Sequence, residues 1–207
     1  MHIVLASGNS GKAAEIKELL HTLDADIQVL SLRDFPDLGP LHEPGATFYD
    51  NALHKAQQVC AHSGRIALAD DSGLEVDALN GQPGVFSARY SGEGATDEAN
   101  NHKLLQALQG VPCPGRGARF RCVLVASAPN GELLSVHGTW EGSIATRPEG
   151  SEGFGYDPVF VDQETGKTAA RMSRGEKSAR SHRGQALRQL LQFWPEFVQR
   201  AAKTKTS

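Results

Sequence analysis

The segment IVLASGNSGK, at residues 3–12, decides how the fold begins. An apolar run opens this segment, and the turn-forming residues SGNSG end the run at once. Apolar residues then recur at the spacing of one helix face, at Ile16, Leu19, Leu20 and Leu23. We therefore predict an N-terminal strand, a glycine-rich loop and a helix, in that order.

Three more helices are predicted from capping signals and apolar spacing. One starts at Thr47, which forms a capping-box pattern with Asp50 ahead of an apolar stripe. Another is expected from Thr96 to Leu108. The last is marked by the apolar residues Leu187, Leu190, Leu191 and Trp194.

Strand patterns lie between these helices. An apolar strand at 66–69 is expected to stop at the turn residues Asp-Asp-Ser-Gly, at 70–73. Residues 74–78 then alternate with the period of two that is typical of a second strand.

A hairpin is predicted in the middle of the chain. Strands at 119–128 and 133–140 flank a Pro-Asn-Gly turn and are expected to run antiparallel. Short strands are added at 142–146 and 159–161. Because helices and strands are mixed throughout, the predicted fold class is α/β, with a mixed β-sheet flanked by helices.

The composition is that of one ordinary globular domain, with 207 residues, 21 basic and 24 acidic side chains and a net charge of -3. A slightly acidic chain is not a broad nucleic-acid binder, which needs a surplus of Lys and Arg. Apolar stretches fall short of the roughly 20 residues that span a bilayer. Three cysteines without a CxxC pair argue against a disulfide framework and a zinc site. With no signal peptide recognised, we expect a cytoplasmic protein.

The loop from Ser7 to Lys12 is the first candidate site. A glycine-rich turn between a strand and a helix leaves backbone N–H groups free to bind phosphate oxygens. The loop is not a Walker A motif, because its glycines lie three residues apart and Ala13 replaces the magnesium-binding Ser or Thr. A plain tight turn is the alternative interpretation.

The second candidate is the carboxylate pair Asp70 and Asp71. In an extended chain the two side chains point in opposite directions, so one can reach a cation while the other is held by the structure. Carboxylate oxygens suit Mg2+, which usually takes one or two protein ligands plus phosphate oxygens and waters. A solvated Asp turn is the alternative.

Two further candidates lie in the C-terminal half. The segment Gly153–Pro158 interleaves two aromatic rings with glycines, and such rings can stack on a base or simply plug the core. Lys177, His182 and Arg183 can converge on an anion or a purine edge, or form a solvated basic face. Taken together, the four candidates supply the groups that a nucleoside triphosphate site needs.

Six motifs follow one another along nearly the whole chain: SGNxGK at 7–12, TFxxNAxxKA at 47–56, ADDSGL at 69–74, GVFSARY at 84–90, GFGYDP at 153–158 and SHRGQAL at 181–187. Together they resemble the inosine/xanthosine triphosphate pyrophosphatase family. The resemblance implies a hydrolase that cuts ITP, dITP and XTP to the monophosphate and pyrophosphate. It also implies Mg2+ as the cofactor and a homodimer as the oligomeric state. The implied fold is an elongated sheet with two lobes around a central substrate cleft. In this chain that domain would comprise residues 1–200, followed by a polar tail at 201–207.

The resemblance also assigns residues. It implies Asp71 as the catalytic base and, with Glu43, as a metal-associated carboxylate. It implies substrate contacts for Ser7, Gly8, Asn9, Ser10, Gly11, Lys12, Lys55, Ser72, Phe154, Gly155, Tyr156, Asp157, Lys177, His182 and Arg183. Two other functions stay open: a related pyrophosphatase for other modified nucleotides, and a nucleotide-sensing or RNA-binding module without catalysis.

Overall fold

A computed structural model describes residues 1–8, 10–23 and 27–203 of the chain. The described residues divide into two units. The first unit comprises Met1–Asp71, Val123–His137 and Ala186–Ser207, apart from the residues outside the described ranges. The second unit comprises Ser72–Cys122 and Gly138–Gln185.

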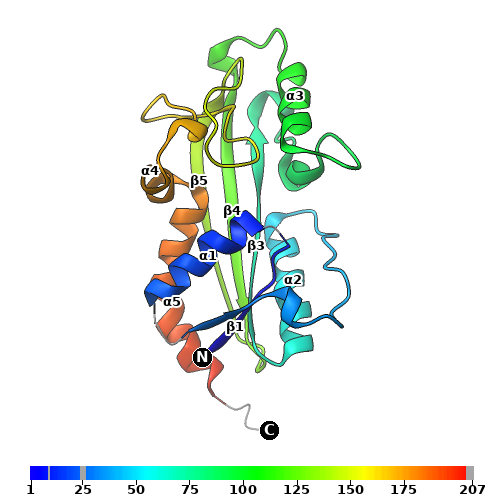
Figure 1. The fold of residues 1–207 in the computed structure, drawn as a ribbon, viewed down its shortest axis with the longest axis vertical. Coiled ribbons are helices and arrows are strands. Elements are labelled where there is room, and N and C mark those ends of the chain that lie inside the picture. Colours follow the sequence, from blue (N-terminus) through cyan, green and yellow to red (C-terminus); the bar gives the residue numbers. More distant parts are fainter. Residues whose placement is uncertain (9, 24–26, 204–207) are drawn as a thin grey trace. The chain divides into compact units, whose positions relative to one another are not determined.

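The strands form a mixed sheet in the order β2-β1-β3-β4-β5-β6 (Figure 1). Their bounds are β1 His2–Leu5, β2 Gln28–Leu30, β3 Ile66–Val76, β4 Gly117–Ser127, β5 Leu133–Ile144 and β6 Phe160–Asp162. β1 runs parallel to β2 and β3, with Ile3 opposite both Val29 and Ile66. β6 runs antiparallel to β5. The predicted α/β fold with a mixed sheet is therefore confirmed.

The first unit contains the helices α1 Ser10–Leu23 and α2 Phe48–Ser63, and most of α5 His182–Ala201. Thr47 caps α2 as predicted, because its hydroxyl oxygen accepts from the Asp50 N–H at 3.1 Å. Ile16 and Leu20 of the predicted α1 stripe are buried, whereas the side chains of Leu19 and Leu23 lie outside the described part of the structure. The apolar face of α2 packs on β1, β3 and β4 through the core residues Val4, Ala6, Ala52, Ala56, Val59, Cys60, Ala67, Ala69 and Val125.

The second unit contains α3 Asp97–Ala107 and α4 Arg174–Arg180. Its core is built on strand residues and the segment before β6, among them Leu74, Phe120, Trp140, Tyr156 and Phe160. Large rings in contact bury much apolar area each, which makes this cluster the main stabilising feature of the unit.

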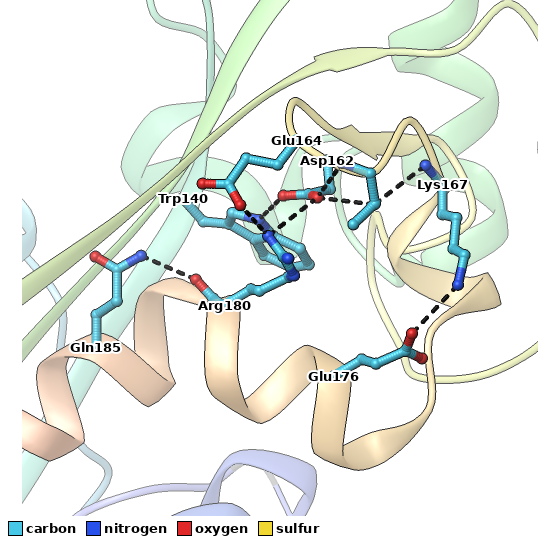
Figure 2. A network of polar contacts seen from close by, with 8 residues as sticks. Trp140, Asp162, Glu164, Lys167, Glu176, Arg180 and Gln185 are labelled. Atoms are coloured by element: carbon cyan, nitrogen blue, oxygen red, sulfur yellow. Dashed lines mark hydrogen bonds and ion pairs between the residues drawn. The ribbon is translucent and has the colours of Figure 1, made fainter.

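One buried carboxylate organises the polar contacts at the end of this core, as Figure 2 shows. The Trp140 indole N–H donates to Asp162 at 2.7 Å, and Arg180 lies 3.7 Å from the other oxygen of Asp162. Arg180 also pairs with Glu164, and its backbone oxygen accepts from Gln185 at 2.9 Å. These contacts tie the junction between α4 and α5 to strands β5 and β6.

Two predicted chain breaks are wrong. β3 runs unbroken from Ile66 to Val76, so Asp70 and Asp71 lie inside a strand and not in a turn. Both are buried, and each has a polar partner on a helix: Lys12 of α1 lies beside one oxygen of Asp70, and Asn51 of α2 donates to Asp71. These partners take the place of the water that would surround the two carboxylates in a turn. The separate strand expected at 142–146 does not exist: residues 142–144 are the end of β5, where a Cβ on Gly142 would lie 2.2 Å from the Val161 oxygen, and residues 145–146 lie beyond the strand.

The other predicted elements are confirmed. β4 and β5 are neighbours joined by a short turn, so they form the expected antiparallel hairpin. In α5, Leu187, Leu190 and Trp194 are buried and Leu191 is half-buried. None of the helices in the described ranges combines the length and apolar character that a membrane crossing requires.

Candidate active site

The loop after β1 has the predicted context. Ser7 and Gly8 follow the strand, and Gly11 and Lys12 lie in the first turn of α1, while Asn9 falls outside the described residues and so does the side chain of Ser10. A Cβ added at Gly8 would meet no described atom within 4 Å. The loop therefore presents open backbone at a helix N-terminus, a position where the helix dipole attracts anions.

Lys12 connects this loop to β3. Its ammonium group lies 3.2 Å from a carboxylate oxygen of Asp70, whose side chain is only 1% exposed. A buried carboxylate needs a positive or hydrogen-bonding partner. Asp70 is therefore the carboxylate held by the structure, and Asp71 points to the other side of the strand.

Lys55 is a buried cation on α2. It donates to the Asp70 backbone oxygen at 2.7 Å and to the Glu43 carboxylate at 2.6 Å. Glu43 lies in the loop before α2 and is about one-third exposed. Lys55 therefore connects the Glu43 carboxylate, in a loop without secondary structure, to β3, the strand that carries Asp71.

The carboxylate of Asp71 accepts from Asn51, a residue that was not among the predicted site residues. The Asn51 amide nitrogen lies 3.0 Å from Asp71, and Asn51 is fully buried. The sequence contains a feature that could have identified Asn51. In the motif at 47–56, Asn51 and Lys55 are four residues apart and so share one face of α2.

Burial raises the pKa of Asp71 above its ordinary value. Lys55, Asn51 and Lys12 oppose that increase, and the negative charge of Glu43 adds to it. A carboxylate with a raised pKa holds a proton more readily than a surface Asp, which suits a general base.

The donor set for a metal is small. Among the described residues there is no group of three or more His, Cys, Asp or Glu side chains that could hold an ion. Glu43 and Asp71 supply two carboxylates, and Mg2+ usually takes one or two protein carboxylates when phosphate oxygens and waters complete its shell. The residues present therefore fit a magnesium ion that binds together with a phosphate ligand.

The predicted aromatic segment lies in the second unit, where Asp157 shapes it. The buried Asp157 carboxylate accepts from the Phe154 N–H at 2.9 Å and pairs with Lys177. Gly153 has φ +81, and a Cβ there would lie 2.0 Å from the same carboxylate. Only glycine lets the loop close tightly over Asp157.

Phe154 is the ring that this loop presents beside cations. Lys177 Nζ lies 4.8 Å and Arg183 Cζ 5.7 Å from the centre of its half-buried ring. The His182 ring stacks on Phe120, with centroids 4.7 Å apart. The structure therefore brings the predicted Phe154, Lys177 and Arg183 together, with His182 packed at the start of the same helix as Arg183.

Tyr156 has a different environment. Its ring belongs to the core of the second unit, and its hydroxyl donates to the Ser87 oxygen at 2.9 Å. Burial raises the pKa of the Tyr156 phenol. The ring thus plugs the core, as the alternative interpretation of this segment allowed. Ser72, which follows Asp71 on β3, is half-buried.

A depression of 540 Å³ lies beside the aromatic segment within the second unit. Of the predicted site residues, only Phe154 and Gly155 line it. Gly155 is held by α3, since its N–H donates to Asp97 at 2.6 Å and its oxygen accepts from Asn101 at 2.9 Å. Two hydrogen bonds therefore connect the lining of the depression to α3.

These features match a known family. The sequence profile described as the Ham1 family covers residues 3–193, which include every predicted site residue. The chain belongs to the Ham1 family. Its similarity to individual members of that family extends over nearly the whole chain.

Three Ham1-family relatives illustrate the match. A dITP/XTP pyrophosphatase of Nitratidesulfovibrio vulgaris is 53% identical over 201 residues, 94% of this chain and 96% of the relative. Another dITP/XTP pyrophosphatase, from Shigella flexneri, is 51% identical over 193 residues, 91% of this chain and 95% of its own length. A solved HAM1 protein structure from Coxiella burnetii has a TM-score of 0.86 at 45% identity, covering 95% of this chain and 99% of that one.

Proposed function

We propose that this Ham1-family chain is a nucleoside triphosphate pyrophosphatase that hydrolyses ITP, dITP and XTP to the monophosphate and pyrophosphate. The observation that carries the proposal is the buried carboxylate of Asp71 beside Lys55 and Glu43, one strand away from an open glycine-rich loop. The names of the relatives, dITP/XTP pyrophosphatase, support the same substrate class.

The first unit supplies the groups for the phosphates. A triphosphate carries about four negative charges near neutral pH, and cations stabilise the charge that builds on a pyrophosphate leaving group. Lys12, Lys55 and the backbone of the loop from Ser7 take this role, with Ser72 as a further contact. Asp71 orients a water molecule towards the α-phosphorus and accepts its proton, a step worth about 10^2 to 10^4 in rate.

Magnesium is part of this proposal. Glu43 and Asp71 would hold the ion, and when bound it supplies positive charge to the phosphate oxygens. The two lysines add to that charge from the protein side. Asp70 has a supporting role in this proposal, because its carboxylate lies 3.2 Å from the Lys12 ammonium group and holds that lysine beside the loop.

The second unit supplies the groups for the base. Phe154 offers a ring for stacking, a contact worth about 1 to 3 kcal/mol. His182 or Arg183 donates to the 6-oxo group of hypoxanthine or xanthine, and Lys177 with Asp157 fixes the surrounding loop. Adenine presents a donor at the same place, which leaves a buried polar group unpaired at a cost of about 1 to 3 kcal/mol.

We also propose that the enzyme works as a cytoplasmic homodimer. The absence of a helix that could span a membrane, within the described residues, is compatible with that location. Sedimentation of the purified chain measures its oligomeric state directly.

A substrate panel with product identification tests the function. The purified chain with Mg2+ should convert dITP, ITP and XTP to monophosphate and pyrophosphate much faster than ATP or GTP. Equal rates on all five, or release of single orthophosphates, would contradict the proposal. Faster turnover of a modified pyrimidine triphosphate would point to a related pyrophosphatase, and tight binding without turnover would point to a nucleotide-binding module.

A further inference from the structure

Asn51 makes two hydrogen bonds that join separate parts of the first unit. Its amide nitrogen donates to Asp71 on β3 at 3.0 Å. Its amide oxygen accepts from the Gly45 N–H at 2.7 Å, in the loop that carries Glu43. One side chain on α2 therefore connects the strand of one carboxylate to the loop of the other.

The orientation of this amide is determined by its partners. The Gly45 backbone N–H can only donate, so the acceptor end of Asn51 faces it and the donor end faces Asp71. Asn51 is fully buried, so water does not compete for either bond. A buried side chain that satisfies both of its ends in this way has little freedom to rotate.

The loop comes this close to α2 because residue 45 is glycine. A Cβ on Gly45 would lie 2.6 Å from the Asp50 Cβ and 2.8 Å from the amide oxygen of Asn51. Any larger residue would push the loop away from the helix. The bond from Gly45 to Asn51 therefore sets how far Glu43 stands from β3.

Lys55 makes a second link of the same kind, one helical turn later. It joins the Asp70 backbone to the Glu43 carboxylate, as Asn51 joins the Asp71 carboxylate to the Gly45 backbone. Two links spaced four residues apart on α2 hold the loop against the strand at two points, which prevents it from pivoting about either one.

We propose that Asn51 is a positioning residue, which holds the Asp71 carboxylate and the Glu43 loop in the arrangement needed for hydrolysis. The proposal rests on the proposed function, because it acts through Asp71. Polar groups that orient metal-binding carboxylates typically affect metal affinity by 10- to 100-fold. A displacement of about 1 Å at a reacting group can cost about 100-fold in rate.

Two variants of Asn51 distinguish the effect of its hydrogen bond to Asp71 from that of its hydrogen bond with Gly45. Asn51→Leu keeps a similar volume and removes both bonds. Asn51→Asp keeps an acceptor for Gly45, replaces the donor to Asp71 by a carboxylate oxygen, and adds a negative charge beside Asp71. The matched control is Asn100→Leu, since Asn100 is also buried and is hydrogen-bonded to the backbone of Ser91 and Ala88, neither of which is a proposed site residue.

The first measurement is dITP hydrolysis with Mg2+, with kcat and KM determined separately. Both Asn51 variants should lower kcat about 100-fold and change KM less than about threefold, because the triphosphate contacts remain. Asn100→Leu should keep the kcat of the natural chain. Circular dichroism verifies that each variant is folded, and Asn51→Asp decides the question if Asn51→Leu does not fold.

The second measurement does not depend on turnover. Binding of Mn2+ in the presence of inorganic pyrophosphate, which supplies the phosphate oxygens of the metal shell, is followed by electron paramagnetic resonance and should be about 10-fold weaker in Asn51→Leu than in the natural chain. If Asn51 only stabilises the fold, its replacement should lower the melting temperature and leave kcat and Mn2+ affinity unchanged in the folded variants. That result overturns the proposal. Equal losses in Asn100→Leu overturn it as well. If the natural chain does not hydrolyse dITP, the proposed function fails, and the Mn2+ affinities still decide the role of Asn51.

Discussion

Replacing Lys55 by Met should destabilise the protein by about 3 kcal/mol, because it removes a buried cation with two partners. The backbone oxygen of Asp70 would lose its bond at 2.7 Å in a place that is almost closed to water. Leaving such a group unsatisfied costs about 1 to 3 kcal/mol. Glu43 is partly exposed and can turn to solvent, so its share is smaller, about 0 to 1 kcal/mol.

Urea unfolding at pH 7 measures this loss as a lower midpoint at an unchanged slope. In a thermal scan the melting temperature should fall by about 6 to 12 °C, at about 2 to 4 °C per kcal/mol for a domain of this size. The control is Lys103→Met. Lys103 also donates to a backbone oxygen, that of Tyr90 at 2.6 Å, but it is exposed, so we expect a loss below about 1 kcal/mol. A loss in Lys55→Met no larger than in this control would refute the reasoning.

Three other substitutions test separate contacts. Asp71→Asn should lower kcat about 10^2-fold or more. Its free energy of unfolding, measured by urea unfolding across pH, should increase relative to that of the natural chain as pH rises above about 4. The sign follows from the raised pKa of Asp71, whose favourable contribution is complete when the group is protonated in both states and is lost as pH rises through the folded pKa. Gly153→Ala should raise the KM for dITP more than it lowers kcat, because the new Cβ collides with Asp157; unchanged kinetics would contradict this. Trp140→Phe should cost about 1 to 3 kcal/mol in chemical denaturation, since it leaves the buried Asp162 without the indole N–H, and a cost near zero would show that this bond is dispensable.

Local signals were enough for most of the elements. The Thr47 cap, the stripe behind it and the Pro-Asn-Gly hairpin each depend on residues close in sequence, and each was predicted correctly. The four candidate segments were also recognisable as motifs, and under the proposed function each supplies a type of group that a triphosphate site needs.

Long-range contacts account for the errors. Asp70 and Asp71 resemble a solvated turn when only their neighbours are considered, yet they continue a buried strand. Lys12 and Lys55 contribute to that burial, and they come from α1 and α2, beyond the reach of a local turn pattern. Tyr156 resembles Phe154 in sequence, but its ring lies in the core while the Phe154 ring lies beside two cations.

The sequence by itself determined the fold class, the order of most elements and the inventory of reactive groups, because caps, apolar periodicity and motifs are local properties. Only the tertiary structure decided which carboxylate each cation neutralises and which side chain holds Asp71. Asn51 is the clearest case, since its role exists only when β3, α2 and the loop of Gly45 meet. A polar side chain can occupy such a buried place only when the folded chain supplies both of its partners at once.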